Sequence, residues 1–501
     1  MANREELLQS FRTYVKKMQD YQSALALLGW DARTHMPKRG VEGRASAIGT
    51  LSAELFTQKT SDKMASFLEE LSLVADSLDQ TTRRMYEECK KQYDRQVLIP
   101  ADRYEAMTVL VSQSESVWQE ARKTSNFTLF QPYLQKIVDM KREFIGYWGY
   151  EDHPYNALLA DFEPGVTVAM LDDVFAGLRA PTVNLLRRIE AAQQPDDTFL
   201  SRHYDPEKQR KFSLFILKEM GYDFDAGCLD ETAHPFETSI APGDIRVTTH
   251  FFPNFLNAAL FGTIHEGGHA LYEQNIAADL IGTNLHSGTS MGIHESQSRF
   301  WENVIGRSYE FWQRYYGDLK NMFPSELSDV SLDHFYAAIN AVKPSLIRIE
   351  ADELTYNLHI MLRYEIEKGL IAGDLQVKDL PEIWNAKMKD YLGVMPDSDA
   401  NGVLQDIHWA GGDFGYFPSY SLGNIYAAQI TRALEKDIPN YREHVTSGNL
   451  SEIRNWLVRH IYQYGSLLTP GEVLQSVTGE SANSEYILDY FEKKFVPLYK
   501  L

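Results

Sequence analysis

The chain has 501 residues, 44% of them apolar, which is enough for about two to four average domains or for one large helical domain. Its formal net charge of −21 at pH 7 argues against nucleic acids and anionic membrane surfaces as partners. Only two cysteines are present, Cys89 and Cys228, so no disulfide framework is expected. The first residues have no apolar segment behind a basic start, and no run approaches the about 18 apolar residues of a membrane span, so we expect a cytoplasmic protein.

An amphipathic helix is predicted at the start of the chain. Its apolar residues alternate in steps of four and three, a spacing that suits packing along another helix: Leu7, Phe11, Tyr14, Met18, Tyr21, Leu25 and Leu28. The stripe faces either the core of the protein or a dimer partner. We expect the helix to end at Gly29 and residues 30–37 to form a turn, with His35 as a structural residue.

Further helices are predicted over most of the first 220 residues. Apolar patterns indicate one helix around Met64–Leu71, one near 79–96, one that opens after Pro100, one around Leu134–Phe144, and one at 168–193 with a kink at Pro181. No internal repeat or flexible linker divides the chain. We therefore expect a mainly α protein with one catalytic domain over residues 1–501, made of a helical lobe (roughly 1–220), a small sheet (222–252), site helices (253–424) and C-terminal helices (425–501).

The composition changes at 222–252, where Thr, Pro, Gly and β-branched residues gather. This pattern predicts a small sheet with a turn at Pro242-Gly243. Its strands either bind an extended peptide through their backbone or form a plain connecting hairpin.

A zinc-binding motif follows the predicted sheet. In the stretch 264–273, which we expect in a helix that starts at Pro253-Asn254, His265 and His269 are four residues apart and project from one helical face. Two imidazoles in this arrangement can bind one zinc ion, and Glu266 can act as a general base on a water molecule. Gly267 and Gly268 each cost the helix about 1 kcal/mol relative to Ala, which indicates close packing by a substrate or by another helix.

A catalytic zinc site commonly has a third protein ligand. The helical pattern at 288–303 offers Glu295 and Glu302, which are seven residues apart and share a predicted face, and spacing leaves both open. His294 is the weaker candidate, because two histidines and one glutamate make the familiar site.

Two polar clusters lie further along the chain. Residues Arg348, Asp352, Tyr356 and His359 recur at helical intervals, as expected for a site or for a buried ion-pair network. The segment 402–420 is rich in glycine and aromatic residues and predicts an ordered loop, in which His408, Tyr416 and Tyr420 either donate to a developing oxyanion or pack as aromatic groups.

Taken together, these motifs resemble the thermostable metallocarboxypeptidases of the carboxypeptidase Taq type. Six blocks occur in the order of that family: His234-Pro235-Phe236, Asp244-x-Arg246-x-Thr248, His265-Glu266-x-x-His269, His294-Glu295-Ser296-Gln297, Ile347-Arg348-x-x-Ala351-Asp352 and Gly402-x-x-Gln405-Asp406-x-His408-Trp409. With the early segment Trp30–Pro37 they extend over about residues 30–424.

The resemblance implies that Glu295 is the third ligand, that the metal is zinc with cobalt able to replace it, and that members are homodimers. It also implies a two-lobed helical body with a deep groove, similar to neurolysin and angiotensin-converting enzyme. The implied activity is the release of single amino acids from peptide C-termini, with broad specificity and poor cleavage around proline or acidic residues.

We expect Glu266 to be the general base and His408 or Tyr420 to stabilise the oxyanion. Arg348 is predicted to bind the substrate's terminal carboxylate, with Arg246 as the alternative, and His234 and Tyr416 are further substrate-binding candidates. Two other functions are weighed against this one: an endo-acting zinc oligopeptidase on the same scaffold, and a non-catalytic helical scaffold protein.

Overall fold

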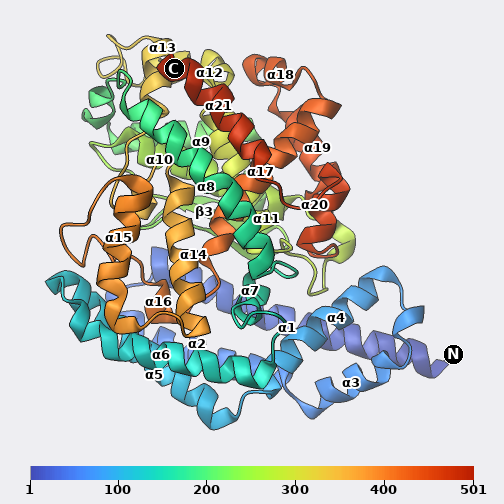
Figure 1. Ribbon diagram of the computed structural model, residues 1–501. Coiled ribbons are helices and arrows are strands. Elements are labelled where there is room, and N and C mark those ends of the chain that lie inside the picture. The colour runs from blue at the N-terminus through green and yellow to red at the C-terminus, as the bar shows by residue number, and fades with distance from the viewer. Residues whose placement is uncertain (1) are drawn as a thin grey trace.

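A computed structural model describes residues 2–501 and shows a mainly helical protein (Figure 1). The N-terminal helices form the lower layer in this view, with the N-terminus at one end of it. These helices are α1 (Ala2–Thr34), α2 (Val41–Lys59), α3 (Asp62–Ser72), α4 (Gln80–Val97), α5 (Ala101–Thr124) and α6 (Phe127–Trp148).

The rest of the chain builds the upper body, with the C-terminus at its top, and α14 and α15 reach down toward the lower layer (Figure 1). Its first helices are α7 (Asn156–Phe162), α8 (Val168–Glu190), α9 (Pro206–Met220), α10 (Leu256–Gln274), α11 (Met291–Arg299), α12 (Tyr309–Met322) and α13 (Leu332–Ile339). Those that follow are α14 (Tyr356–Ala372), α15 (Leu380–Leu392), α16 (His408–Gly411), α17 (Phe417–Asp437), α18 (Tyr441–Ser447), α19 (Leu450–His460), α20 (Pro470–Thr478) and α21 (Glu485–Tyr499).

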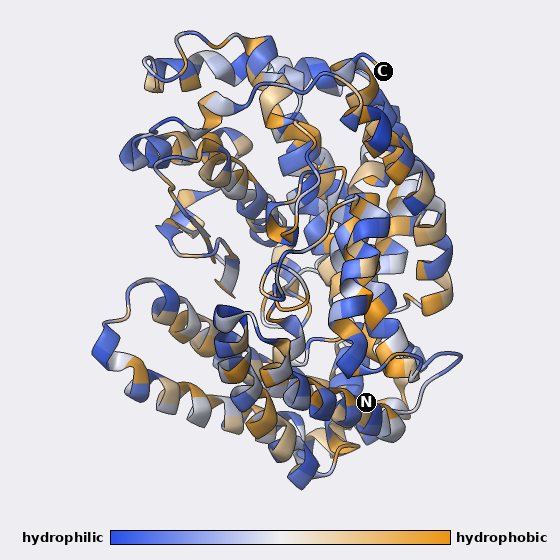
Figure 2. Cartoon of the chain, turned by 60° about the vertical axis from the view of Figure 1, so that its left-hand side comes forward, coloured by the Kyte–Doolittle hydropathy of each residue, from blue (hydrophilic) through white to orange (hydrophobic). Residues whose placement is uncertain are grey.

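The predicted helices of the first 220 residues are confirmed, and their amphipathic character is visible in Figure 2, where hydrophilic and hydrophobic residues alternate along the ribbons. One apolar core includes residues from Phe11 to Tyr499. Among residues 2–501, no helix is both long and apolar enough to cross a membrane.

Helix α1 turns its apolar stripe toward this core. Phe11 and Met18 are buried, and Tyr14 and Leu25 pack against the buried residues, so the core-facing interpretation of the stripe is the correct one. The predicted end at Gly29 is wrong, because α1 continues to Thr34. A single glycine costs a helix about 1 kcal/mol, and the burial of the next residue offsets this, since Trp30 packs edge-on against Phe236 at 5.4 Å between ring centroids.

The predicted sheet is present and has three strands in the order β1-β3-β2: β1 (Leu229–Glu231), β2 (Glu237–Ala241) and β3 (Asp244–Thr249). Strands β2 and β3 are antiparallel around the turn at Pro242-Gly243, and Gly243 supplies its positive φ of 81°. Strand β1 pairs with β3 in parallel. The sheet packs on α10 through a small apolar cluster that includes Val247 and Ala270.

Glycines let α10 and α17 approach α11 closely. A Cβ on Gly268 of α10 would lie 2.7 Å from the carbonyl oxygen of Gln297, and a Cβ on Gly423 of α17 would lie 2.4 Å from Cγ of Glu295. On the other side of α10, Gly267 faces Leu217 of α9. The predicted close packing at these glycines therefore comes from other helices, and it places α11 directly beside the His-Glu-x-x-His turn.

We predict opposite effects for alanine at two helical glycines. Gly268→Ala forces a methyl group into the α11 backbone and should destabilise the protein by about 3 kcal/mol. Gly49→Ala is the control, because Gly49 lies inside α2 and its Cβ would meet nothing within 4 Å, so it should stabilise by up to about 1 kcal/mol. Thermal unfolding at one scan rate measures both, and a tolerated Gly268→Ala would contradict the close contact.

Candidate metal centre and active site

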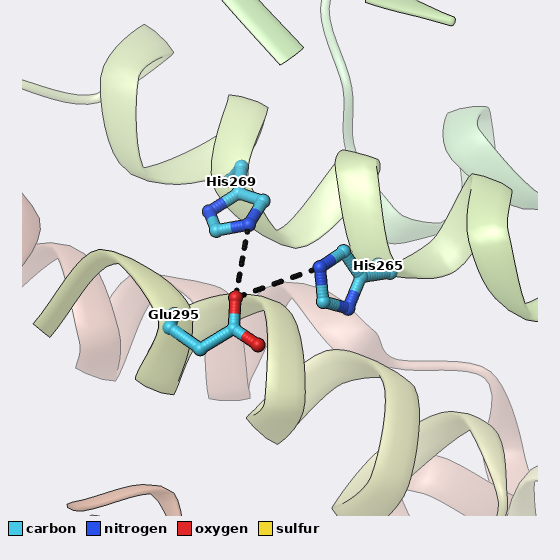
Figure 3. A group of neighbouring side chains, drawn as sticks. All are labelled: His265, His269 and Glu295. Atoms are coloured by element: carbon cyan, nitrogen blue, oxygen red, sulfur yellow. Dashed lines mark ion pairs between the residues drawn. The ribbon is translucent and has the colours of Figure 1, made fainter. Parts of the chain in front are cut away.

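Three of the predicted residues meet at one point between α10 and α11 (Figure 3). His265 and His269 project from one face of α10, and Glu295 approaches from α11. Oε2 of Glu295 lies 3.6 Å from Nε2 of His265 and 3.4 Å from Nε2 of His269. One ligand atom from each residue lies within 4.8 Å of the others, a spacing at which a single ion can touch all three.

Hydrogen bonds orient both imidazoles for metal binding. Nδ1 of His265 donates to Oε2 of Glu302 at 2.9 Å, and Nδ1 of His269 is hydrogen-bonded to Nδ1 of His294. His294 in turn donates from Nε2 to Glu273 at 3.0 Å. These contacts occupy Nδ1 of both rings and leave each Nε2 facing Glu295, the arrangement of metal-binding histidines.

The charge states of the three residues also suit a divalent metal. Burial lowers the pKa of His269 to about 3, which keeps this imidazole neutral and able to bind a metal. Burial alone would raise the pKa of Glu295, but Arg299 and His265 lower it well below its usual range, so this carboxylate is ionised. Burial alone would lower the pKa of His265, but the carboxylates of Glu295 and Glu302 raise it, so a metal ion bound here would displace a proton from this ring. Two imidazoles and one carboxylate fit a catalytic metal site with an open fourth position.

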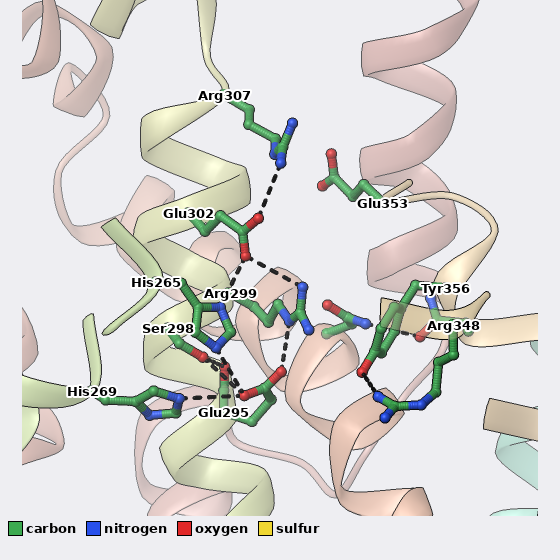
Figure 4. Close-up of polar contacts among 12 residues, drawn as sticks. His265, His269, Glu295, Ser298, Arg299, Glu302, Arg307, Arg348, Glu353 and Tyr356 are labelled. Carbon is green, nitrogen blue, oxygen red and sulfur yellow. Dashed lines mark hydrogen bonds and ion pairs between the residues drawn. The ribbon is translucent and has the colours of Figure 1, made fainter. Parts of the chain in front are cut away.

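Glu302, the alternative third ligand, serves the metal site indirectly (Figure 4). Besides His265, it accepts hydrogen bonds from Arg299 at 3.3 Å and from Arg307 at 3.1 Å. Arg299 also donates to Oε1 of Glu295 at 2.7 Å. The helix changes at Phe300 into a π-helical segment, η6 (Phe300–Gly306), and Glu302 on this segment reaches His265.

Glu266 follows the first histidine and lies on the same buried turn. Its side chain is 7% exposed, and burial raises its pKa to about 7. A carboxylate with a raised pKa is a stronger base, which is the property required of a group that removes a proton from water.

Arg348 is the centre of a second cluster. Its Nε and Nη2 donate to Oδ1 of Asp406 at 3.0 and 2.9 Å, and its Nη1 donates to the hydroxyl of Tyr356 at 2.9 Å. The other oxygen of Asp406 accepts from Nε of Arg363 at 2.7 Å. Arg348 is 5% exposed and its guanidinium lies 5.0 Å from the ring centroid of Tyr420.

The expected helical face from Arg348 to His359 does not exist. Arg348 lies in the short turn η7 (Arg348–Glu350), and α14 begins only at Tyr356. The physical reason is Asp352, whose carboxylate accepts the backbone N–H groups of Leu354 and Thr355 and so competes with helix formation before α14. Arg348 and Tyr356 still meet, because the chain folds back between them.

The three aromatic candidates of the segment 402–420 form one cluster beside Arg348, in which His408 stacks on Tyr416 and both meet Tyr420 edge-on. The segment is not a continuous loop as predicted, because His408 begins α16 and Tyr420 lies in α17. The His408 ring lies 5.5 Å from that of Tyr416, and Nε2 of His408 lies 3.4 Å from the hydroxyl of Tyr420. Burial lowers the pKa of His408 to about 4, so it is neutral, and burial raises the pKa of Tyr416 to about 12. The charge of the Glu295 carboxylate also raises the pKa of Tyr416.

The other two substrate-binding candidates lie in and beside the sheet. Arg246 pairs with Asp244 of the same strand through Nε at 2.7 Å and Nη2 at 2.8 Å, and it lies over the Trp30 ring. His234 is exposed just before β2, and its backbone carbonyl accepts from Thr232. Neither residue belongs to the cluster around Arg348.

Sequence reasoning missed the residues that support these groups: Glu273, Arg299, Tyr356 as a partner of Arg348, Arg363 and Asp406. A local signal existed for two of them, since Glu273 follows His269 by one helical turn and Arg299 follows Glu295 by one turn. Arg348 and Asp406 are 58 residues apart, and no local pattern pairs them.

Comparison with known proteins agrees with this geometry. Residues 10–495 match the family described as carboxypeptidase Taq (M32) metallopeptidase. The chain belongs to this family. It is 47% identical to carboxypeptidase 1 of Bacillus subtilis, with 98% of each chain covered, and 42% identical to thermostable carboxypeptidase 1 of Thermus thermophilus, with 95% of each covered.

Solved structures are similar over the whole length. An M32 carboxypeptidase from Deinococcus radiodurans R1 gives a TM-score of 0.97 at 36% identity, with 99% of this chain and 100% of that chain covered. The structure titled BsuCP gives 0.91 at 46% identity, with 99% and 100% covered. The prediction of a mainly helical, metal-dependent carboxypeptidase is thus confirmed at the level of the M32 family.

We predict that Glu302→Gln weakens metal binding about 10–100-fold, because it removes the charged acceptor that orients His265 in this M32 peptidase. His265→Ala should remove most of the affinity. Calorimetric titration of metal-free protein with Zn²⁺ measures both. Glu365→Gln is the matched control, because Glu365 pairs with Lys387 and Tyr391, and its affinity should equal that of the wild type.

Proposed function

We propose that this M32 peptidase removes single amino acids from the C-termini of peptides, with zinc bound by His265, His269 and Glu295. Two imidazoles and one glutamate are the ligand set of many zinc peptidases, which supports zinc over harder cations. Cobalt is proposed as a replacement on the strength of the family resemblance. The homodimer, the cytoplasmic location, the deep groove and the single catalytic domain over 1–501 likewise remain proposals.

The observation that carries exopeptidase action is an uncompensated positive charge around Arg348. Arg348 and Arg363 share one carboxylate, Asp406, and all three are buried. The adjoining imidazoles of His408 and His359 are neutral and do not change this balance, because burial lowers the pKa of His408 to about 4 and that of His359 well below its usual value. Burial and the Arg348 charge also lower the pKa of Arg363 to about 10, although Asp406 opposes them.

A substrate α-carboxylate would neutralise this excess. The hydrogen bonds of Arg348 to Asp406 and Tyr356 use three of its five N–H groups and leave one on each terminal nitrogen. These two donors suit a carboxylate, which guanidinium groups bind in pairs. Arg246, the alternative anchor, has its fork paired with Asp244. Arg348 is therefore our proposed anchor.

The proposed mechanism divides the work among the residues of the two clusters. His265, His269 and Glu295 would hold a metal ion that would polarise a water molecule and the scissile carbonyl. Glu266 accepts the proton from the water and later delivers it to the leaving amine. Neutral His408 or the Tyr420 hydroxyl donates a hydrogen bond to the oxyanion, and Tyr416 and His234 contribute contacts to the peptide. Arg348 sets which bond is cut by holding the terminal carboxylate.

An endo-acting oligopeptidase is the second candidate, because the metal site would serve both reactions. It does not need the excess positive charge at Arg348, which therefore favours the carboxypeptidase. A non-catalytic scaffold needs neither the raised pKa of Glu266 nor the oriented histidines.

If Glu266 is the general base, its replacement should lower turnover without affecting metal or substrate binding. Glu266→Gln should lower kcat by about 10²–10⁴-fold, since the amide cannot accept the proton, while metal content and KM change little. Steady-state kinetics on a free-acid peptide, with metal analysis of the same sample, test this. Wild-type turnover in Glu266→Gln would remove Glu266 from the mechanism.

If Arg348 binds the terminal carboxylate, cleavage should require a free carboxylate at the C-terminus of the substrate. One peptide is digested as free acid and as C-terminal amide, and products are followed by mass spectrometry with chelator and with restored Zn²⁺ or Co²⁺. The wild type should shorten only the free acid, one residue at a time, and only with metal. Arg348→Ala should lower kcat/KM on the free acid by at least about 100-fold with metal content unchanged, and Arg348→Lys should lose less.

Arg246→Ala is the control arginine in this experiment and should retain most activity. If it loses activity while Arg348→Ala does not, Arg246 is the anchor. Internal cleavage of both peptide forms by the wild type would instead move the protein to the oligopeptidases.

A further inference from the structure

Lys494, near the end of the chain on α21, has a buried ammonium group with three partners. It pairs with Oε2 of Glu353 at 2.5 Å, donates to the hydroxyl of Tyr490 at 3.0 Å, and reaches the carbonyl oxygen of Asn303 at 3.4 Å. The two charged side chains are only 7% and 8% exposed. A buried ion pair adds little net stability, yet breaking it is costly, so its placement calls for a role other than stability.

One partner of Lys494, the Asn303 carbonyl, lies next to the residues of the metal site. Asn303 lies in the π-helical segment η6, directly after Glu302, which orients His265. A π-helical turn departs from the α-helical hydrogen-bond pattern, and such turns occur frequently at functional sites. The Asn303 carbonyl accepts from Tyr490 at 3.1 Å as well as from Lys494, so α21 holds this segment by two contacts.

The other partner, Glu353, lies close in the chain to Arg348, which we propose binds the terminal carboxylate of the substrate. Glu353 lies between Arg348 and Tyr356 in the chain, and these two residues hydrogen-bond to each other. Figure 4 shows Glu353 on their side, across from Arg307 and Glu302. The segment that carries the metal-site residues and the segment that carries Arg348 and Tyr356 already touch elsewhere, because the Arg299 guanidinium lies 4.6 Å from the Tyr356 ring centroid. Lys494 makes a second connection between the same two segments, through Asn303 and Glu353.

We infer that Lys494 is a positioning residue that fixes the separation between the metal ligands and Arg348, through Asn303 on one side and Glu353 on the other. The inference rests on the proposed function, because release of one residue requires a fixed distance between the reacting carbonyl and the bound carboxylate. Misplacement of a substrate by about 1 Å can cost about 100-fold in rate. Loss of the bridge therefore lowers activity and allows cleavage of peptide bonds other than the last one.

Two double variants separate positioning from stability. Lys494→Met with Glu353→Leu removes both charges and the bridge, and leaves no unpaired buried ion. Lys494→Gln with Glu353→Gln also removes both charges but retains hydrogen-bonding groups at both positions. Lys493→Met is the matched control, because Lys493 is exposed and pairs with Asp489 on the surface of α21.

Each variant is assayed on the free-acid peptide for kcat/KM and for its products, with melting temperature and zinc content measured on the same preparation. We expect the Met/Leu variant to melt near the wild type and to retain zinc, yet to lose at least about 100-fold in kcat/KM and to release dipeptides beside single amino acids. The Gln/Gln variant should recover most of the activity and the single-residue products, and Lys493→Met should match the wild type.

Activity that follows melting temperature in both double variants, with wild-type products throughout, would show a merely structural ion pair and overturn the inference. If the wild type itself does not release single residues from the free acid, the proposed function fails and this inference fails with it. A wild type that behaves as proposed, beside an unaffected Met/Leu variant, overturns the inference alone.

Discussion

Close contact between the backbones of α10 and α11 is the constraint on which the site depends. No side chain separates the two helices at Gly268, where a Cβ would collide with the α11 backbone, and none separates Glu295 from α17 at Gly423. This proximity brings Glu295 within 4 Å of both histidines. A bulkier contact would move α11 away and leave two histidines without their third ligand.

The same packing buries several charged side chains, and each of them is stabilised by ion pairs with oppositely charged neighbours. Glu295 and Glu302 share Arg299, while Arg348 and Arg363 share Asp406. In the first group, which lies around the metal site, Arg307 also pairs with Glu302, so two guanidinium groups balance the two carboxylates. The second group has an excess of guanidinium, which a terminal carboxylate of the substrate would neutralise.

Local geometry decides how much of this arrangement the sequence predicts. His265 and His269 follow from helical spacing alone, and the turn at Pro242-Gly243 follows from its residue types. Spacing could not choose between Glu295 and Glu302, because the helix changes from α to π at Phe300 and alters the direction of every later side chain.

Contacts between distant segments could not be read from the sequence. The partnership of Arg348 with Asp406 joins two segments that share no pattern, and the predicted helical face failed because Asp352 caps its neighbours' N–H groups. At Gly29, burial of the adjacent Trp30 outweighs the weak helix propensity of glycine, so α1 continues to Thr34. Tertiary contacts determined the result at Asp406 and Trp30, whereas at Asp352 a local side-chain cap did.

The arrangement of charge also gives a physical reason for the broad specificity that the resemblance implies. An anchor that recognises the α-carboxylate uses a group present in every peptide, whereas side chains contribute contacts of variable strength. Near the metal ligands, burial and the charge of Glu273 raise the pKa of Glu237 to about 8, so a further negative charge is unfavourable in this region. An acidic substrate side chain would enter a region already crowded with carboxylates, where like charges repel and desolvation is costly. The poor cleavage around acidic residues that the resemblance implies thus has a cause in the same groups that prepare the metal site.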